Sequence, residues 1–353
     1  MSRWFEEAGQ DASGVIYSRL RLSRNLDGRP FPAKLEEKES RELLTALREG
    51  LQDMETGPGT GLEMREGGQI RELERQAMRE RRILNSAAVG KKGPWGLMTS
   101  QDEAVSLALN VDDHIRLQLL GQGLCLEQLW EQADRMDDWI NQRFPYAFDS
   151  KYGYLTAFPT NVGTGLRCCV VLHLPALSKV KKFQSIVADM GRFGTAIRGL
   201  YGEGADNYGG FYEISNQRTL GLTEREIVEL VTKAAVQLSN QEKRVRSAAL
   251  NSQRLDKEDE AYKSYGVLRY ARKITEKDAR IFLSILMEAR AEGLLSFEAP
   301  VSLYGILIGI KPASLRLASD RPLDKEEVDA ARAAYIRERL PKLSANEPGG
   351  NTI

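Results

Sequence analysis

Apolar and polar residues alternate in some segments of this 353-residue chain and recur every three or four positions in others. Alternation over residues 15–22 predicts a strand, because successive side chains of a strand point to opposite faces. Apolar residues between 126 and 140 recur at helical spacing and predict an amphipathic helix. The connections between the strands favour a mostly antiparallel sheet flanked by helices. The same criteria predict strands at 95–99, 104–110, 114–119, 154–158, 166–174, 195–201 and 211–214, helices at 35–54, 71–82 and 181–194, and a glycine-rich loop at 56–68.

The pattern becomes almost entirely helical in the last third of the chain. Thr223 and Glu226 have the spacing of a capping box, which predicts a long helix from there to about Ser252. The charged run RLDKEDE at 254–260 is expected to break the helical pattern before it continues to Leu340. We therefore expect an α+β protein with four parts: a flexible N-terminus at 1–14, a sheet-containing domain at 15–253, a small helical C-terminal domain at 254–341 and a disordered tail at 342–353.

Composition narrows the class of protein. Apolar residues make up 42% and charged residues 28% of the chain, which is typical of a globular protein. Lys plus Arg and Asp plus Glu both number 50, and this balance argues against non-specific nucleic-acid binding. The start of the chain has no apolar core of a signal peptide, and the longest apolar run, near 301–310, is too short to span a bilayer. We expect a cytoplasmic protein without nucleic-acid or membrane partners.

The cysteines support the same compartment. Cys125, Cys168 and Cys169 are odd in number, and two of them are adjacent. This spacing fits neither a disulfide framework nor a zinc site. It is typical of a protein from a reducing compartment.

Arginines gather near the ends of predicted strands. Arg19 and Arg21 are two positions apart on one strand and so share a face. Arg116, Arg167 and Arg198 each lie at or beside the end of another predicted strand. Converging guanidinium groups suit a triphosphate, because each offers paired donors and a fixed charge. The alternative is a set of surface ion pairs, which for any single arginine is the more common arrangement.

Two acids and two histidines are further candidates. Asp112 and Asp113 would face opposite ways if they lay on a strand, so that only one of them could enter a given site. His114, near a strand end, is expected to be a hydrogen-bonded structural residue rather than a catalytic base. The same expectation holds more strongly for His173, which lies inside an apolar strand.

Glycines mark two loops. Gly163 and Gly165 are not followed by the Lys and Ser/Thr of a phosphate-binding P-loop, and a turn that needs positive φ explains them equally well. The segment 202–210 contains four glycines with Glu203 and Asp206 between them. Such a loop either closes over a ligand or is a floppy surface loop, and the sequence leaves both open.

Several segments together resemble the phosphagen (guanidino) kinase superfamily, and within it most closely the bacterial protein arginine kinases. Five segments in the same order carry most of the resemblance, and the stretches 264–272 and 331–340 add to it. The similarity covers most of residues 15–340. The five segments are SRLRLSRN at 18–25, NVDDHIRLQ at 110–118, YLTAFPTNVGTGLR at 154–167, RGLYGEGADNYGG at 198–210 and ISNQRTLGLTE at 214–224.

The resemblance implies a fold, a reaction and partners. The fold is an antiparallel sheet flanked by helices, followed by a helical domain that often dimerises. In the reaction, ATP with Mg²⁺ gives its γ-phosphoryl group to an arginine side chain of a protein. The implied partners are arginine-bearing protein substrates, an activator or protease adaptor, and a second copy of the chain. The resemblance implies that the phosphates are bound by Arg19, Arg21, Arg116, Arg167 and Arg198. It implies that the acceptor is held by Asp112 and Asp206. Of the family's phosphoarginine-binding motif, this chain retains Asp329 and Arg332.

The chain departs from the family pattern at the acceptor site. Asp112 and Asp206 stand where the family has glutamates, and a carboxylate withdrawn by about 1 Å can cost about 10²-fold in rate. Glu203 is close enough in sequence to be a substitute. Val111 replaces an acid, and Phe158 replaces a cysteine.

The C-terminal motif departs as well, because Val328 stands in place of its first arginine. Two alternatives to a protein arginine kinase therefore stay open. One is a pseudokinase or adaptor that binds nucleotide or proteins without efficient transfer. The other is a kinase for a small guanidino metabolite.

Overall fold

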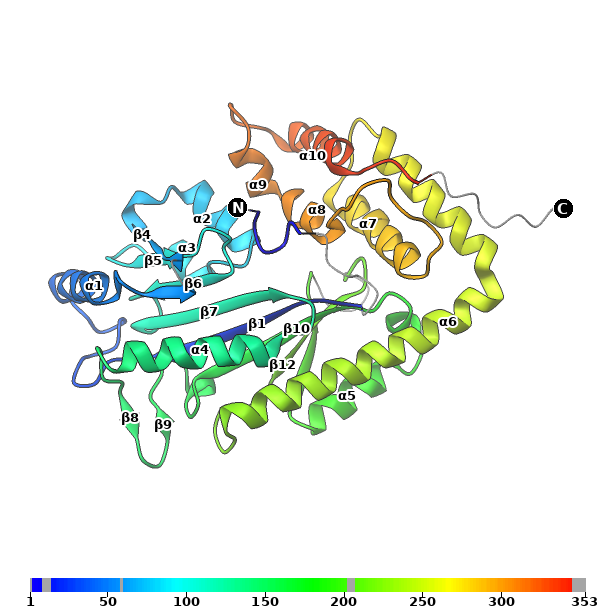
Figure 1. Cartoon of the computed structure of the whole chain (residues 1–353). Coiled ribbons are helices and arrows are strands. Elements are labelled where there is room, and N and C mark those ends of the chain that lie inside the picture. The colour runs from blue at the N-terminus through cyan, green and yellow to red at the C-terminus, as the bar shows by residue number, and fades with distance from the viewer. Residues whose placement is uncertain (1, 8–13, 58–59, 202–206, 345–353) are drawn as a thin grey trace.

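The computed structural model describes residues 2–7, 14–57, 60–201 and 207–344. An eight-stranded antiparallel sheet forms the centre of the molecule (Figure 1), as expected. Its strand order is β11-β12-β10-β1-β7-β6-β5-β4. The eight strands are β1 (Val15–Arg24), β4 (Glu63–Glu66), β5 (Gly96–Thr99), β6 (Val105–Leu109), β7 (Ile115–Gln122), β10 (Leu166–His173), β11 (Thr195–Gly199) and β12 (Phe211–Asn216), and two short ribbons join β2 (Glu55–Gly57) to β3 (Thr60–Gly61) and β8 (Phe148–Asp149) to β9 (Gly153–Tyr154).

One face of the sheet is an apolar layer under four helices. Alternate residues of the central strands, such as Leu20, Leu117 and Val170, are buried there against these helices. Burial of this kind is the main favourable term in folding, at about 25 cal/mol per Å² of apolar surface. In Figure 1, α4 and α6 run along this side of the sheet. The helices are α1 (Glu37–Leu51), α4 (Leu126–Asn141), α5 (Phe183–Arg192) and α6 (Glu224–Tyr270).

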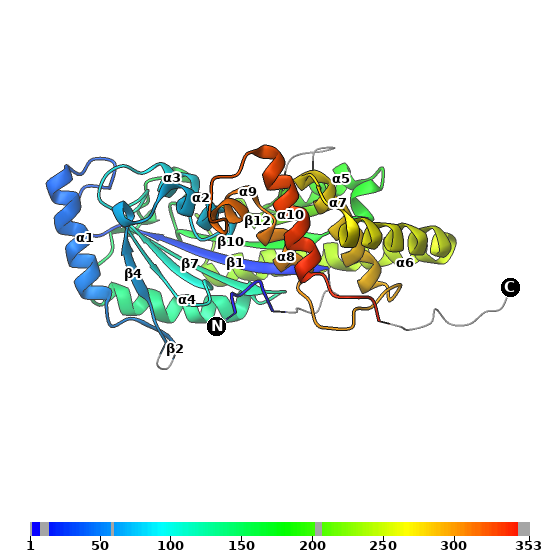
Figure 2. The same ribbon diagram turned by 90° about the horizontal axis from the view of Figure 1, so that it is seen from above.

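The opposite face is covered only in part. Near one end of β1, Tyr17 and Val171 pack with Leu303 and Tyr304 of the C-terminal helices. Figure 2 shows these helices grouped over one end of the molecule. The remaining part of this face therefore stays open for polar side chains. The elements on this side are α2 (Glu72–Glu80), α3 (Ser86–Gly90), α7 (Glu276–Ala291), α8 (Leu303–Gly309), α9 (Pro312–Leu317) and α10 (Lys325–Arg339).

The helix that we expected to end near Ser252 is interrupted at the next residue, but the charged run at 254–260 is helical rather than a break. The long helix α6 starts at the predicted capping box of Thr223 and is interrupted at one residue only, Gln253, with φ −138° and ψ 35°. Figure 1 shows the change in direction there. Lys257 explains why the run continues as helix: its Nζ lies 2.5 Å from a carboxylate oxygen of Glu288 on α7. Lys257 thus faces a neighbouring helix, whereas Arg254, Asp256, Asp259 and Glu260 are exposed.

The N-terminus differs from the flexible segment that we expected. Trp4 and Phe5 are buried, and the ring of Trp4 packs edge-on against Tyr17 at 5.3 Å between centroids. The carbonyl of Phe5 accepts a hydrogen bond of 2.7 Å from Ser302. Two large apolar side chains near the start of the chain thus fill the gap between the sheet and the C-terminal helices.

Three other segments differ from the sequence-based expectation. In the expected loop at 56–68, Glu63–Glu66 forms the edge strand β4, paired with β5. In the expected strand at 154–158 only Tyr154 is in a strand, because the backbone N–H of Ala157 donates to Asp113 instead of to a neighbouring strand. In the expected disordered tail, Leu343 forms a β-bridge with Phe297, and residues 345–353 lie outside the described residues.

The three cysteines are free thiols, two of them buried. Within the described part of the chain, no helix is both long enough and apolar enough to cross a bilayer.

Both histidines are structural, as predicted. Nε2 of His173 lies 2.7 Å from the hydroxyl of Ser284, and its ring stacks on Phe211. Nδ1 of His114 accepts from the backbone N–H of Leu26 at 2.9 Å. Burial lowers the pKa of His173 to about 3 and that of His114 to about 4, so both rings are neutral at neutral pH.

We predict that His173→Gln makes stability less sensitive to acid. The pKa of His173 falls from its usual 6.5 to about 3 in the folded protein, so the unfolded chain takes up a proton first as the pH falls. Stability is therefore lost as the pH falls from about 6.5, by up to about 1.4 kcal/mol per pH unit for this group. Urea unfolding at a series of pH values measures the slope. Equal slopes in the variant and the unchanged protein would contradict the prediction.

Candidate active site

The strand register places the five predicted arginines on one face of the sheet. Arg19 and Arg21 are on β1, and Arg21 lies opposite Arg167 of β10. Arg116 of β7 lies opposite Ser23, which has the same facing as Arg21. Arg198 of β11 lies opposite Glu213 of β12, which continues the same face. This is the face that the apolar layer leaves open, and four strands contribute to it.

The central arginines are buried close together. The Nε atoms of Arg19, Arg21 and Arg116 are buried and have no hydrogen-bond partner among the described residues. The neighbouring charge of Arg19, followed by burial, lowers the pKa of Arg21 to about 10. Burial lowers the pKa of Arg116 to about 10, and the charge of Arg19 adds to this effect. Buried like charges are unfavourable without a counter-ion, so this cluster suits an anion with several charges.

Ion pairing explains only one of these arginines. Arg19 Nη2 lies 2.8 Å from Oε2 of Glu213. Neither Arg21 nor Arg116 forms an ion pair within the described residues. The surface ion-pair alternative therefore does not account for the cluster.

Arg167 is held in place by its surroundings. Its guanidinium donates to the carbonyls of Thr160 at 2.8 Å and Asn216 at 2.7 Å, and to the side-chain oxygen of Asn161 at 3.1 Å. Burial, and after it the charge of Arg198, lowers the pKa of Arg167. A fixed orientation of this kind prepares a donor for a ligand before the ligand arrives.

Arg21, Arg116 and Arg167 open into one cavity of about 310 Å³ together with acids from the β6–β7 connection. The cavity is therefore lined by both cations and carboxylates. The lining residues are Arg21, Ser23, Asn85, Asp112, Asp113, Arg116, Phe158, Thr160, Asn161, Gly165 and Arg167.

The two acids lie in a turn between β6 and β7, so the expectation that only one of them could enter a given site does not hold. Asn110 adopts φ 56°, a left-handed conformation that asparagine tolerates, and its N–H donates to the carbonyl of His114. In this tight turn Asp112 and Asp113 both reach the cavity. Oδ2 of Asp112 accepts 2.8 Å from Nδ2 of Asn85.

Asp113 has a structural role in addition. Its Oδ1 accepts from Nδ2 of Asn25 and from the backbone N–H of Ala157, both at 2.7 Å. Burial raises the pKa of Asp113, and these hydrogen bonds oppose that change. Asp112, with fewer protein contacts, is the acid available to a ligand.

The structure shows where Val111 and Phe158, two residues that depart from the family pattern, lie. Val111 is buried among apolar residues that include Ile70 and Met78, a position where an acid would be costly. Phe158 is 50% exposed and lies at the edge of the cavity. The space beside Asp112 is thus more apolar than the resemblance implies.

Gly163 and Gly165 are required by a tight turn. Gly165 has φ +64°, and a Cβ there would lie 2.6 Å from the carbonyl of Ser23. Gly163 has φ +110°, and its Cβ would lie 2.2 Å from the carbonyl of Thr219. Their conformation fits the turn interpretation rather than that of a phosphate-binding loop.

Asp206, the second predicted acceptor-binding acid, lies outside the described residues, as does Glu203. The residues that flank this segment, Tyr201 and Asn207, are described. Asp112 is therefore the one predicted acceptor acid that the structure places beside the arginines.

Arg82 is a neighbour of the cluster that the sequence did not reveal. It has a left-handed φ of 73°, and its Nε is buried without a partner. Burial raises the pKa of Tyr17 to about 12, and the charges of Arg82 and Arg19 both oppose that change. The carbonyl of Arg82 accepts 2.7 Å from Gln118, on the arginine face of β7. The sequence pattern at the end of α2 does not indicate that Arg82 lies beside the arginine cluster.

Arg332 is not the exposed helix residue that we weighed as an alternative. It is 2% exposed and donates to the carbonyls of Ile310 at 3.0 Å and Ile274 at 2.9 Å. It also pairs with Asp329. Val328 is buried beside them. A phosphoarginine at this position would have to displace contacts that hold the helical domain together.

Comparison with known proteins agrees with this geometry. Residues 43–245 match the family model of the ATP:guanido phosphotransferase C-terminal catalytic domain. Two solved kinases share the fold: the duplicated taurocyamine kinase of Schistosoma mansoni (TM-score 0.59, 24% identity, 68% of this chain and 35% of that one) and a lombricine kinase (TM-score 0.58, 23% identity, 71% and 72%). The chain therefore belongs to the ATP:guanido phosphotransferases.

The particular branch follows from the C-terminal region and the full-length relatives. Residues 233–350 match the protein-arginine kinase McsB C-terminal domain. The protein-arginine kinase of Desulforamulus reducens is 36% identical over 97% of this chain and 96% of its own length. That of Bacillus subtilis is 35% identical over 96% and 93%. Within its class, the chain belongs to the protein-arginine kinase family.

We predict that Arg332→Ala strongly destabilises the protein. The substitution leaves Asp329 and two buried carbonyls without their partner, which costs about 3–5 kcal/mol. Urea unfolding measures this change. Arg321→Ala, which removes an exposed ion pair with Glu327, is the control and should cost less than about 1 kcal/mol. Equal small effects would contradict the structural role of Arg332.

We also predict that Arg21→Met abolishes most of the thermal stabilisation by MgADP. Methionine keeps the apolar stem and removes one of several mutually repelling charges, so the ligand-free protein should melt no lower than the unchanged one. Ligand stabilisation follows the affinity, which should fall about tenfold or more. Differential scanning fluorimetry with increasing MgADP measures both. Arg41→Met, at an exposed site paired with Glu37, should leave both values unchanged.

Proposed function

We propose that this chain transfers the γ-phosphoryl group of ATP to the guanidinium group of arginine side chains in proteins. The observation that carries the proposal is the cavity in which Arg21, Arg116 and Arg167 face Asp112. Such a cavity offers cations to a polyphosphate and a carboxylate to a cationic acceptor. The names of the full-length relatives support the same activity.

The arginines position the nucleotide and stabilise the charge that develops during transfer. Phosphoryl transfer depends mainly on in-line positioning and charge stabilisation. Arg167 is oriented by four protein acceptors, and the Nε donors of Arg21 and Arg116 have no partner among the described residues. Mg²⁺ would be held mainly by the phosphates and water, as is usual for this ion. No group of three or more metal-binding side chains occurs among the residues that the structure describes.

Asp112 is proposed to hold the acceptor guanidinium. A carboxylate can bind two N–H groups of a guanidinium and so direct the third nitrogen. Asn85 fixes one oxygen of Asp112 at 2.8 Å, which restricts its rotation. Asp206 is proposed as the second acid, with Glu203 as its substitute.

The cellular compartment and the partners of the enzyme are also part of the proposal. Three free cysteines fit a reducing cytoplasm. We propose that the partners are arginine-bearing proteins, a second copy of the chain, and an activator or adaptor. The pseudokinase and the metabolite kinase remain as outcomes of the test below.

Incubation of the purified protein with Mg-ATP and an arginine-rich protein should give acid-labile phosphate on arginine. Phosphoarginine-preserving mass spectrometry identifies the product. Absence of arginine-linked phosphate across many substrates, together with binding of MgADP, would favour the pseudokinase. Fast turnover of free arginine would favour the metabolite kinase.

Asp112→Asn should lower kcat by about 10²-fold or more, because the acceptor loses its orienting charge. Nucleotide affinity should change little. Asp206→Asn and Glu203→Gln separate the two candidates for the second acid: the acid that contacts the acceptor should give the larger loss. Wild-type kcat in Asp112→Asn would refute the role of Asp112.

A further inference from the structure

One short turn of the C-terminal helices contacts two segments, one close in sequence to Arg198 and the other close to Arg82. Lys311 is the N-cap of α9, and residues 311–314 form the first turn of this helix; we call them the 311–314 turn. On one side the turn meets Tyr201, two residues after the strand β11 that carries Arg198. On the other side it meets Glu80 at the end of α2, two residues before Arg82.

Lys311 makes the contact with Tyr201. Its Nζ lies 4.2 Å from the centroid of the Tyr201 ring, and the guanidinium carbon of Arg280 lies 3.9 Å from the same centroid. Glu276 joins the two cations: Lys311 Nζ lies 2.6 Å from its Oε1, and Arg280 pairs with the same oxygen. Cation–π contacts gain strength when the cation is partly desolvated, and the side chain of Lys311 is only 14% exposed.

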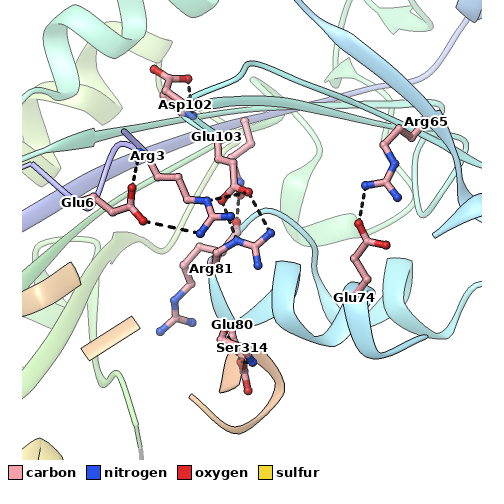
Figure 3. A network of polar contacts seen from close by, with 12 residues as sticks. Arg3, Glu6, Arg65, Glu74, Glu80, Arg81, Asp102, Glu103 and Ser314 are labelled. Carbon is pink, nitrogen blue, oxygen red and sulfur yellow. Dashed lines mark hydrogen bonds and ion pairs between the residues drawn. The ribbon is translucent and has the colours of Figure 1, made fainter. Parts of the chain in front are cut away.

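Glu80 makes the second contact (Figure 3). Its carboxylate accepts from the backbone N–H groups of Ala313 at 2.9 Å and Ser314 at 2.8 Å, and from the hydroxyl of Ser314 at 2.9 Å. The next residue, Arg81, binds Glu103 through two hydrogen bonds of 2.8 and 2.9 Å. The two residues before the left-handed Arg82 are thus both fixed, and this conformation needs such support.

The turn itself is fixed from inside the helical domain. Arg332 donates to the carbonyl of Ile310, the residue before Lys311. It also donates to the carbonyl of Ile274, two residues before Glu276. The buried guanidinium of Arg332 therefore fixes the chain just before Lys311 and just before Glu276.

We propose that Lys311 and Glu80 are positioning residues for the nucleotide. Through the 311–314 turn they keep the strand of Arg198 and the α2 end with Arg82 at a fixed separation. Neither residue needs to touch the nucleotide. If either contact is lost, the segment that it holds, with Arg198 or with Arg82, becomes free to move. Part of the binding free energy is then used to order this segment when the nucleotide binds. The inference rests on the proposed function, because it assumes that the arginine cluster binds ATP.

Calorimetric titration with MgADP tests the proposal without requiring phosphoryl transfer. Lys311→Ala should raise the dissociation constant about tenfold, and Lys311→Arg, which restores a cation over the ring, should return it to within about twofold of the unchanged protein. Glu80→Ala should weaken binding in the same direction. Lys325→Ala, which removes an exposed lysine of α10, is the matched control and should have no effect.

Two further measurements separate positioning from general destabilisation. In the active enzyme, Lys311→Ala should raise KM for ATP and leave KM for the protein substrate unchanged. The double variant Lys311→Ala/Glu80→Ala should weaken MgADP binding by less than the product of the single effects, because one free wall already relaxes the site. Glu80→Ala provides the test by itself if Lys311→Ala does not fold.

The proposal is overturned if Lys311→Ala and Glu80→Ala bind MgADP as tightly as the unchanged protein. It is also overturned if Lys311→Arg is as weak as Lys311→Ala, or if both KM values rise together. Failure of the unchanged protein to bind MgADP would instead refute the proposed function on which the inference rests.

Discussion

Mutual repulsion between buried arginines is the constraint around which this structure is arranged. Arg19, Arg21 and Arg116 come close together on one face of the sheet, with buried Nε atoms that lack partners. Glu213 offsets part of the charge through its pair with Arg19. The remaining positive charge costs stability in the ligand-free protein and becomes favourable when a polyphosphate supplies the opposite charge.

The rest of the fold keeps this unfavourable cluster in place. The apolar layer on the opposite face of the sheet fixes the strand register, and a slip of one residue would turn every arginine into the core. The tight turn at Gly163 and Gly165 brings Arg167 into reach of the carbonyls that orient it. The C-terminal helices cover the other end of the arginine face, so that only the polar end stays open.

The departures from the family pattern concentrate at the acceptor side and in the C-terminal motif. All five expected arginines lie on one face of the sheet, whereas on the proposed acceptor side Asp112 is an aspartate, Val111 is buried and the half-exposed Phe158 lines the cavity. In the motif, Val328 packs in the interior, and Arg332 serves as a structural link between α10, α7 and the 311–314 turn.

The sequence by itself determined the antiparallel sheet, most helices, the capping box at Thr223 and the family, because periodicity and local motifs are properties of neighbouring residues. It also placed Arg116, Arg167 and Arg198 near strand ends and Arg19 and Arg21 on one strand, and the register then puts all five on one face of the sheet. Tertiary structure decided what depends on residues far apart in the chain. The long helix α6 bends at Gln253. Trp4 and Phe5 fill the gap beside Tyr17. Arg82 lies beside the arginine cluster because distant segments contact it. No local pattern contains these choices, because their free energy comes from contacts that exist only after the chain has folded.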